Sequence, residues 1–333
     1  MFYDINHDAY FKIVLVLRNN FKLAKMSNQN ELIEKINEKY TKMGLDPEAF
    51  YKGLLYSKPI NYWDYIEVES LLSLQKPRTN YPDEMVFIMY HQVTELLLNM
   101  MIHEMNQVCN AVDIKADFFI EKLGRMNRYI QMLANSFDVM RLGMDPKQYN
   151  EFRFSLTPAS GFQCASFRFA EICSTDIENL ADTRIKNNLP VNYDMAFLFE
   201  NIYWQAAGKD HKTGKKSYLL NLFEEKYLAQ FIAMANEYKT KNIWQKYIAM
   251  PEADKKNPTL IQAMKDLDIE FNIKWPLVHL RAAEQYLDNG SKIIEATGGS
   301  DWKKYLHPMY QKRVFFPGLW SAEELNNWAK DYK

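Results

Sequence analysis

Hydrophobic positions recur at helical spacing along most of the chain, and their densest stretch lies at residues 82–104. Pro82, Asp83 and Glu84 are typical of a helix start, because proline suits the first turn and acidic side chains suit the positive end of the helix dipole. Beyond them, apolar residues occur on every side of the helical wheel, as in a buried helix. The pattern therefore predicts a long helix that runs through the middle of the molecule.

Two polar residues interrupt this apolar helix. His91 and Glu95 are four positions apart, so they lie on the same face. Burying such groups is costly unless they are hydrogen-bonded or bind something. Taken alone, the helix favours a core histidine that is satisfied by Glu95 or by a carbonyl group. The alternative is a polar spot that faces a partner or a ligand.

Amphipathic patterns predict further helices on both sides of this stretch. The predicted ranges are 28–43, 46–57, 62–75, 116–142, 148–156, 193–204, 217–238, 244–253, 257–287 and 303–313, followed by a short C-terminal helix. Glycine (11) and proline (12) are scarce, which disfavours a turn-rich all-β fold. No linker divides the helices. We therefore expect an unassigned extension at 1–27 and a single all-α domain over 28–333.

Composition narrows the classes of partner. The formal net charge of -1 excludes a broadly basic nucleic-acid binder. The apolar run Ile13–Leu17 is too short to span a bilayer, and no basic segment precedes it, so we expect neither a membrane anchor nor a strong signal peptide. Three cysteines without a CxxC motif indicate a reducing compartment, which predicts a cytoplasmic protein.

The histidines do not match the common metal motifs. His103-Glu104 is followed by Gln107 where a zincin needs its second histidine, and no histidine on a predicted helix has an acidic residue three positions before it, as a ferritin-like site requires. What remains is His91 and His279 on separate apolar helices. A lone histidine such as His279 is more often a satisfied core residue, but one histidine on an apolar helix is also a common haem axial ligand.

A candidate anion site follows the predicted helix at 148–156. Tyr149 and Arg153 share one face, and the turn after them, up to Gly161, offers amides and hydroxyls. An arginine in such a place can hold a carboxylate bidentately. The equally good alternative is an arginine that ties two helices together.

Five segments, in this order, resemble the tryptophan 2,3-dioxygenase family: YWDYIEVESLLSLQ, PDEMVFIMYHQVTELLLNMMIHE, EFRFSLTPASGFQ, WPLVHLRAA and ATGGS. The likeness runs from about Tyr62 to Trp320 and is poor over 176–260. It implies an all-α bundle of long helices that encloses a pocket for haem b. It also implies a dioxygenase that converts L-tryptophan and O2 to N-formyl-L-kynurenine, the first step of the kynurenine pathway, as a homotetramer built from two dimers.

The resemblance also implies a role for individual residues. His279 matches the haem iron ligand, and His91 matches the distal histidine that hydrogen-bonds the indole nitrogen. Arg153 matches the residue that clasps the substrate carboxylate. The other matched positions are Phe87, Tyr149, Leu156 and Thr297 as substrate contacts, Ser160 near the haem edge, and Tyr62, Tyr65 and Ile66 as residues that reach into a neighbouring subunit's site.

The sequence departs from the family pattern at two places. Pro276 stands where a helix-compatible residue is usual. Asp301-Trp302 follows TGGS in place of Ser-Gly, which bears on the closure of the flexible TGGS turn that the resemblance implies is a lid over the site. Two alternatives stay open. One is a haem enzyme on the same scaffold that oxidises another indole or aromatic amino acid. The other is a non-catalytic haem-binding or helical scaffold protein.

Overall fold

The computed structural model describes residues 28–156, 161–186, 188–210, 213–287, 307–310 and 312–332. Over these residues the secondary structure is helical, apart from two isolated β-bridges, Ala181 with Ile202 and Lys209 with Lys216. The predicted all-α fold is therefore confirmed for this part of the chain. The chain divides into two compact units, Met1–Leu74 and Gln75–Lys333. A single domain over 28–333 stays a prediction, and each unit is described by itself.

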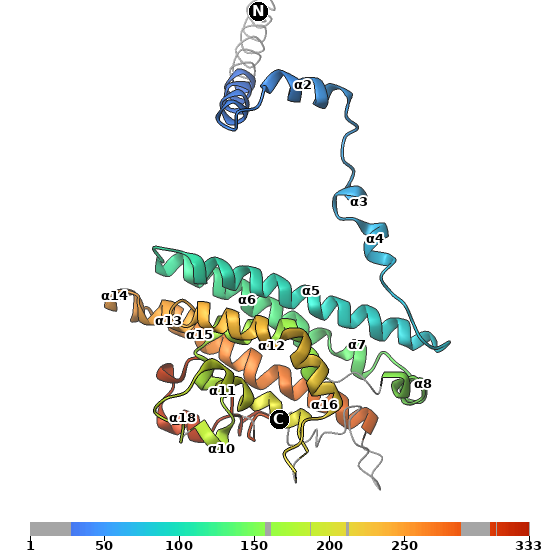
Figure 1. Ribbon diagram of the computed structural model, residues 1–333, viewed down its shortest axis with the longest axis vertical. Helices are drawn as coiled ribbons and strands as arrows, with labels where there is room; N and C mark the ends of the chain where they lie inside the picture. Colours follow the sequence, from blue (N-terminus) through green and yellow to red (C-terminus); the bar gives the residue numbers. More distant parts are fainter. Residues whose placement is uncertain are drawn as a thin grey trace, which may run out of the picture. The chain divides into compact units, whose positions relative to one another are not determined.

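The first unit contains a helix over 28–42, then α2 (Pro47–Tyr56), α3 (Tyr62–Tyr65) and α4 (Val68–Leu72), as Figure 1 shows. The side chain of Asp46 caps α2 by accepting the N–H of Glu48 at 3.0 Å. The predicted helix over 62–75 is interrupted at Glu67, whose φ of 52° is left-handed and cannot continue a right-handed helix. None of the described residues of this unit is buried.

The second unit is a stack of helices in which α5 (Pro82–Asn110) packs on α6 (Ala116–Ser136) and on α9 (Ala165–Ser174). In turn, α6 packs on α15 (Pro258–Ile269), and α12 (Tyr218–Tyr238) packs on α9 and on α11 (Met195–Glu200). The other elements are α7 (Asp138–Arg141), α8 (Pro146–Phe152), η1 (Arg153–Leu156), η2 (Gly161–Gln163), η3 (Ile177–Leu180), α10 (Thr183–Lys186), η4 (Tyr203–Gly208), α13 (Ile243–Ile248), α14 (Glu252–Lys255), η5 (Glu270–Lys274), α16 (Trp275–Leu287), η6 (Pro317–Leu319) and α18 (Ala322–Asn326).

Helix α6 illustrates how the hydrophobic pattern builds the core. Its apolar residues at intervals of three or four positions form one stripe, and all are fully buried against neighbouring helices: Phe119, Leu123, Met126, Ile130 and Leu133. Truncating one such side chain to alanine costs about 2–5 kcal/mol, because it removes apolar contacts and leaves a cavity. The stripe thus fixes the position of α6 between α5 and α15.

Within this unit α5 is buried on one side only, so the prediction of a helix that is buried all round was wrong. One side is buried in the core through Leu97, Leu98, Met101 and Met105. The opposite side carries apolar residues whose side chains are 39–51% exposed, namely Met89, Val93, Leu96 and Met100, and Figure 1 shows the helix at the edge of this unit. The length and composition of α5 would also allow it to cross a membrane. Core helices of soluble proteins meet the same criterion.

The helix that carries His279 is continuous from Pro258 to Leu287, as predicted, but its middle is a π-helical turn, η5. Within it the N–H of Trp275 donates to the carbonyl of Glu270, five residues back. Because Pro276 has no N–H and would crowd the preceding turn of a regular α-helix, this wider turn lets the helix pass the proline without ending.

Other boundaries differ from the predictions. The helix expected over 116–142 ends at Ser136 and is followed by the separate turn α7, and the one expected over 244–253 is divided by Pro251 into α13 and α14. Of the helix predicted over 303–313, the described residues 307–310 and 312–313 are not helical. Here Phe315 and Phe316 are fully buried, so the chain is held by tertiary contacts.

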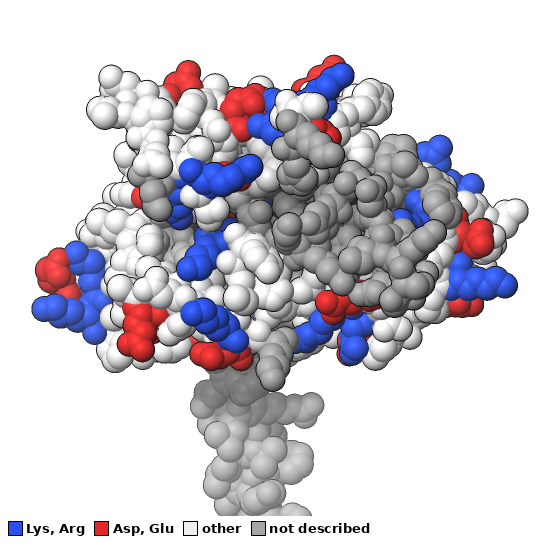
Figure 2. All heavy atoms as spheres, turned by 90° about the horizontal axis from the view of Figure 1, so that it is seen from below, with Lys and Arg blue, Asp and Glu red and all other residues white. Residues whose placement is uncertain are grey.

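One buried carboxylate ties this C-terminal segment to the helix of His279. Asp268 accepts the N–H groups of Phe315 and Phe316 at 2.8 and 3.1 Å and the indole N–H of Trp320 at 2.9 Å. Burial raises the pKa of Asp268 to about 6, although these hydrogen bonds act in the opposite direction. At the surface, acidic and basic side chains are interspersed over the face drawn in Figure 2, consistent with the small net charge.

Candidate active site

Helix α5 and helix α8 bring three of the predicted site residues into one aromatic cluster. The rings of Phe87 and His91, one helical turn apart on α5, have centroids 4.0 Å from each other. The ring of Tyr149, on α8, lies 6.3 Å from that of Phe87, and Phe152 packs edge-on against Phe87 at 5.7 Å. Phe152, which was not predicted as a site residue, is fully buried and packs between the two helices.

The orientation of the His91 ring is fixed by its own helix. Its Nδ1 atom lies 2.7 Å from the carbonyl oxygen of Phe87. Since a carbonyl oxygen can only accept, Nδ1 carries the proton and Nε2 of the neutral ring has a free lone pair. Desolvation lowers the pKa of His91, and the Phe87 carbonyl and the charge of Glu95 offset this only in part. His91 keeps accessible surface in the described structure, so the ring is not sealed inside the core.

Glu95 links the turn after His91 to the start of α9. Its Oε1 atom accepts a hydrogen bond from the Cys164 thiol at 3.1 Å. Burial, together with the nearby Glu95 carboxylate, raises the pKa of Cys164 to about 12. The thiol therefore stays protonated at neutral pH, and Cys164 holds helices together instead of acting as a nucleophile.

Helix α8 and the turn η1 position the predicted anion clamp. Asp145 caps α8 by accepting the N–H of Lys147 at 2.8 Å, and the N–H of Arg153 donates to the carbonyl of Tyr149 at the other end. The side chain of Arg153 is 6% exposed, and the ring of Tyr149 packs on Tyr286 with centroids 4.5 Å apart. A buried guanidinium suits a carboxylate ligand, because it can form two parallel hydrogen bonds to it.

His279 lies on α16 in an apolar, aromatic setting. Its ring centroid is 5.2 Å from that of Phe137 and 6.2 Å from that of Trp275. Burial lowers the pKa of His279 to about 4, and a positive charge on His91 would act in the same direction. The imidazole is therefore neutral at physiological pH, which is the form that binds a metal ion. This donor in this setting fits the axial ligand of a haem.

Two aromatic rings connect the two histidines. Tyr90 lies 6.1 Å from His91 and 5.8 Å from Phe137, which in turn contacts His279. Tyr90 and Phe137 were not predicted as site residues. Tyr90 is next to His91 in the sequence, but its side chain points to the buried side of α5, and nothing in the pattern around Phe137 marks it.

The remaining predicted residues are not brought together by the described structure. Tyr62, Tyr65 and Ile66 belong to the first unit, where they are 73%, 74% and 40% exposed. The backbone of Leu156 ends η1, but its side chain lies outside the description, as do Ser160, Thr297 and the segment Asp301-Trp302.

Fold and site together define a helical protein, over the residues described, with two neutral histidines on separate helices and a buried arginine that follows Phe152 of the aromatic cluster in the chain. A family model described as tryptophan 2,3-dioxygenase matches residues 54–250, which includes His91 and Arg153 and ends before His279.

Curated relatives named tryptophan 2,3-dioxygenase match over most of the chain. One from Bacillus thuringiensis (strain Al Hakam) is 28% identical over 285 residues, 80% of this chain and 93% of that protein. One from Bradyrhizobium diazoefficiens is 26% identical over 292 residues, 86% and 99% of the two chains. One from Herpetosiphon aurantiacus is 27% identical over 282 residues, 80% and 98%.

The chain belongs to the tryptophan 2,3-dioxygenase family. Its activity is accordingly that of an oxidoreductase of tryptophan catabolism, a tryptophan dioxygenase. The family membership also accounts for the site, because Phe87, His91, the buried Arg153 and the half-buried His279 all lie in the segments on which the resemblance was based.

Proposed function

We propose that this enzyme binds haem b through His279 and converts L-tryptophan and O2 to N-formyl-L-kynurenine. The observation that carries the proposal is the pair of neutral imidazoles, His91 on α5 and His279 on α16, connected through Tyr90 and Phe137. The haem would supply the reactivity toward O2, and the protein would supply binding and orientation.

The distal residues would hold the indole. Phe87 would pack on the indole ring, and Nε2 of His91 would accept the indole N–H, since Nδ1 already donates to the Phe87 carbonyl. The lowered pKa of His91 supports a hydrogen-bonding role, because the acceptor form prevails at neutral pH. A fixed acceptor at one edge of the ring would orient the indole and reduce the entropic cost of reaching a reactive geometry.

The opposite end of the substrate would be held by charge. Arg153 would bind the carboxylate, with Tyr149 and Leu156 lining the same side. A buried guanidinium and a planar carboxylate can form two parallel hydrogen bonds, which gives both affinity and orientation. Thr297 would contact the ammonium or carboxylate group as its loop closes, and Ser160 would lie near the haem edge.

We also propose a homotetramer in which Tyr62, Tyr65 and Ile66 contribute to a neighbouring subunit's site. Two observations support an assembly: the first unit has no buried described residue, and α5 exposes an apolar row that includes Leu96 and Met100. Sedimentation equilibrium of the purified chain should give four times the chain mass. A monomer at micromolar concentration would contradict this part of the proposal.

A cytoplasmic location is proposed on chemical grounds. The three cysteines Cys109, Cys164 and Cys173 are all free thiols, and such thiols persist in reducing compartments. Fractionation of the source cells, with detection by a specific antibody, should find the protein in the cytosolic fraction and not in the membrane pellet.

The decisive experiment is an aerobic assay of the ferrous, haem-loaded protein with L-tryptophan and isotopically labelled O2. Absorbance of N-formylkynurenine, with both of its added oxygen atoms labelled by mass, is the expected result. A product with one labelled oxygen would instead favour an enzyme of the same scaffold with a different reaction. Haem binding without turnover of tryptophan would favour a sensor, and no haem binding would favour a scaffold.

A further inference from the structure

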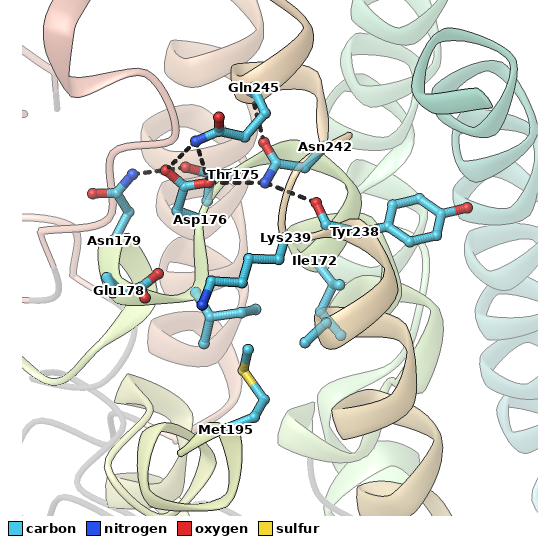
Figure 3. A pocket seen from close by; sticks show the side chains of 12 residues that line it. Ile172, Thr175, Asp176, Glu178, Asn179, Met195, Tyr238, Lys239, Asn242 and Gln245 are labelled. Atoms are coloured by element: carbon cyan, nitrogen blue, oxygen red, sulfur yellow. Dashed lines mark hydrogen bonds between the residues drawn. The ribbon is translucent and has the colours of Figure 1, made fainter. Parts of the chain in front are cut away.

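A second hollow lies at the C-terminal end of α9, between η3, α12 and α13, and shares no lining residue with the candidate active site (Figure 3). Its volume is about 240 Å³. Apolar side chains form one part of its wall, and charged or amide side chains form the other. The apolar part includes Ile172 and Met195, and the polar part includes Asp176, Glu178, Lys239 and Asn242.

The polar wall is built around one carboxylate. Asp176 accepts the side-chain amides of Asn242 and Gln245, each at 2.9 Å, and these bonds are drawn in Figure 3. Asn242 is 1% exposed, and its own oxygen caps α13 by accepting the N–H of Gln245 at 3.0 Å. Asp176 is therefore held in place before any ligand arrives, which lowers the entropic cost of binding.

The rim carries one group of each charge. Glu178 accepts a hydrogen bond from Tyr193 at 2.9 Å, which fixes its carboxylate at the edge of the hollow. Lys239 follows the last turn of α12, and Figure 3 shows its side chain extending toward the segment that carries Glu178. No ion pair or hydrogen bond joins the Lys239 ammonium to any residue in the described part of the chain.

From this arrangement we propose that the hollow binds a small α-amino acid with an apolar side chain. Its ammonium group would lie against Glu178 and Asp176, its carboxylate against Lys239, and its side chain against Ile172 and Met195. A simple anion would face two carboxylates, a simple cation would face the lysine, and an uncharged apolar molecule would leave all three charges unmatched. Its volume of about 240 Å³ is below the roughly 300–1,000 Å³ of pockets for drug-sized ligands, so the hollow suits a smaller molecule such as a single amino acid.

The hollow and the candidate active site are connected by helix α9. Helix α9 begins beside Cys164, which is bonded to Glu95 one turn from His91, and it ends at Thr175 in the wall of the hollow. Its ten residues span about 15 Å. The amino-acid site and the candidate active site thus lie at the two ends of one helix, and the proposal needs no haem.

Calorimetric titration of the full-length protein with L-leucine tests the site, because leucine has no indole ring to be oxidised. We expect saturable binding of one leucine per chain, weakened at least tenfold in Lys239→Met and in Glu178→Gln. Lys226→Met, which removes another exposed lysine of α12, serves as the matched control and should bind like the wild type. The kcat and KM for tryptophan should be the same in Lys239→Met as in the wild type.

Arg153→Ala separates this site from the active site. Leucine binding should survive in Arg153→Ala, in which the proposed substrate clamp is removed. No heat with L-leucine, L-methionine or L-valine, or equal affinities in Lys239→Met and the wild type, would overturn the proposal. So would loss of leucine binding in Arg153→Ala alone, since leucine would then occupy the catalytic pocket. None of the binding measurements depends on whether the protein oxidises tryptophan.

Discussion

The Nδ1 atom of His91 lies 2.7 Å from the carbonyl oxygen of Phe87, so the ring is held in the tautomer whose Nε2 accepts. The carbonyl belongs to the preceding turn of the same helix. Nε2 of His91 therefore remains as the ring atom that can accept a hydrogen bond from a ligand. The contact is also compatible with both interpretations of His91 from the sequence, a satisfied core histidine and a ligand-binding residue. His91 is satisfied by a carbonyl, as a core histidine would be, and still has an acceptor to offer.

Replacing His91 with alanine should therefore weaken catalysis through the loss of one hydrogen bond. An unmatched buried N–H costs about 1–3 kcal/mol, so we expect kcat/KM for L-tryptophan to fall roughly 5- to 150-fold. Steady-state kinetics with benzothienylalanine, an analogue without the ring N–H, should show little difference between the two proteins. His103→Ala, on the exposed face of α5, is the matched control. An equal loss with both substrates would exclude the hydrogen bond as the cause.

Arg153→Ala should raise KM for L-tryptophan strongly. Hydrogen bonds to a charged group contribute about 1.5–3 kcal/mol, which corresponds to a roughly 10- to 150-fold loss in kcat/KM. With tryptamine, which has no carboxylate, kcat/KM should be the same for Arg153→Ala and for the wild type. Arg184→Ala removes an exposed arginine that pairs with Asp182 at 2.7 Å, and it should leave KM unchanged. An unaltered KM in Arg153→Ala would mean that this residue only connects helices.

His279→Ala should abolish stable haem binding while leaving the helical content intact. The side chain contributes to no hydrogen bond within the described residues, so its removal deletes a metal donor and little else. Titration with hemin, followed at the Soret band, should show a tight complex for the wild type and for His103→Ala but not for His279→Ala. Partial recovery of the band on adding free imidazole would identify the missing ligand. A normal Soret band in His279→Ala would assign the iron to another residue.

Sequence patterns predicted correctly those features whose physical cause lies within a few neighbouring residues. Pro82 and the acidic residues after it marked the start of α5, Asn257 marked the start of α15, and helical spacing placed Tyr149 next to Arg153. The position of α5 was missed because apolar residues on all sides indicate burial in an assembly as well as in one chain. Contacts between residues far apart in the sequence leave no local pattern, as the contact between Phe137 and His279 illustrates.

The role of Asp268 also had no signal in the sequence, and it leads to a prediction about stability. Its pKa is about 6 in the folded protein, against an ordinary value of 3.8. Between these values the folded state binds more protons than the unfolded state, so the contribution of Asp268 to stability is present below about pH 4 and is lost as the pH rises toward 6. The carboxylate in turn raises the pKa of Lys186, although burial has the larger effect and lowers that pKa.

Asp268→Asn should remove this dependence. Urea unfolding at several pH values between 4 and 7 should show that the stability difference between wild type and variant shrinks as the pH rises, by at most about 1.4 kcal/mol per pH unit. At all pH values the variant should be less stable by about 1–3 kcal/mol, since an asparagine cannot accept from both sides where Phe315, Phe316 and Trp320 donate. Asp266→Asn, two positions away, should show neither effect, because the Asp266 side chain accepts a hydrogen bond from the exposed Gln262 amide on the same helix. A constant stability difference would mean that Asp268 is ionised across this range, with its hydrogen bonds outweighing the cost of burial.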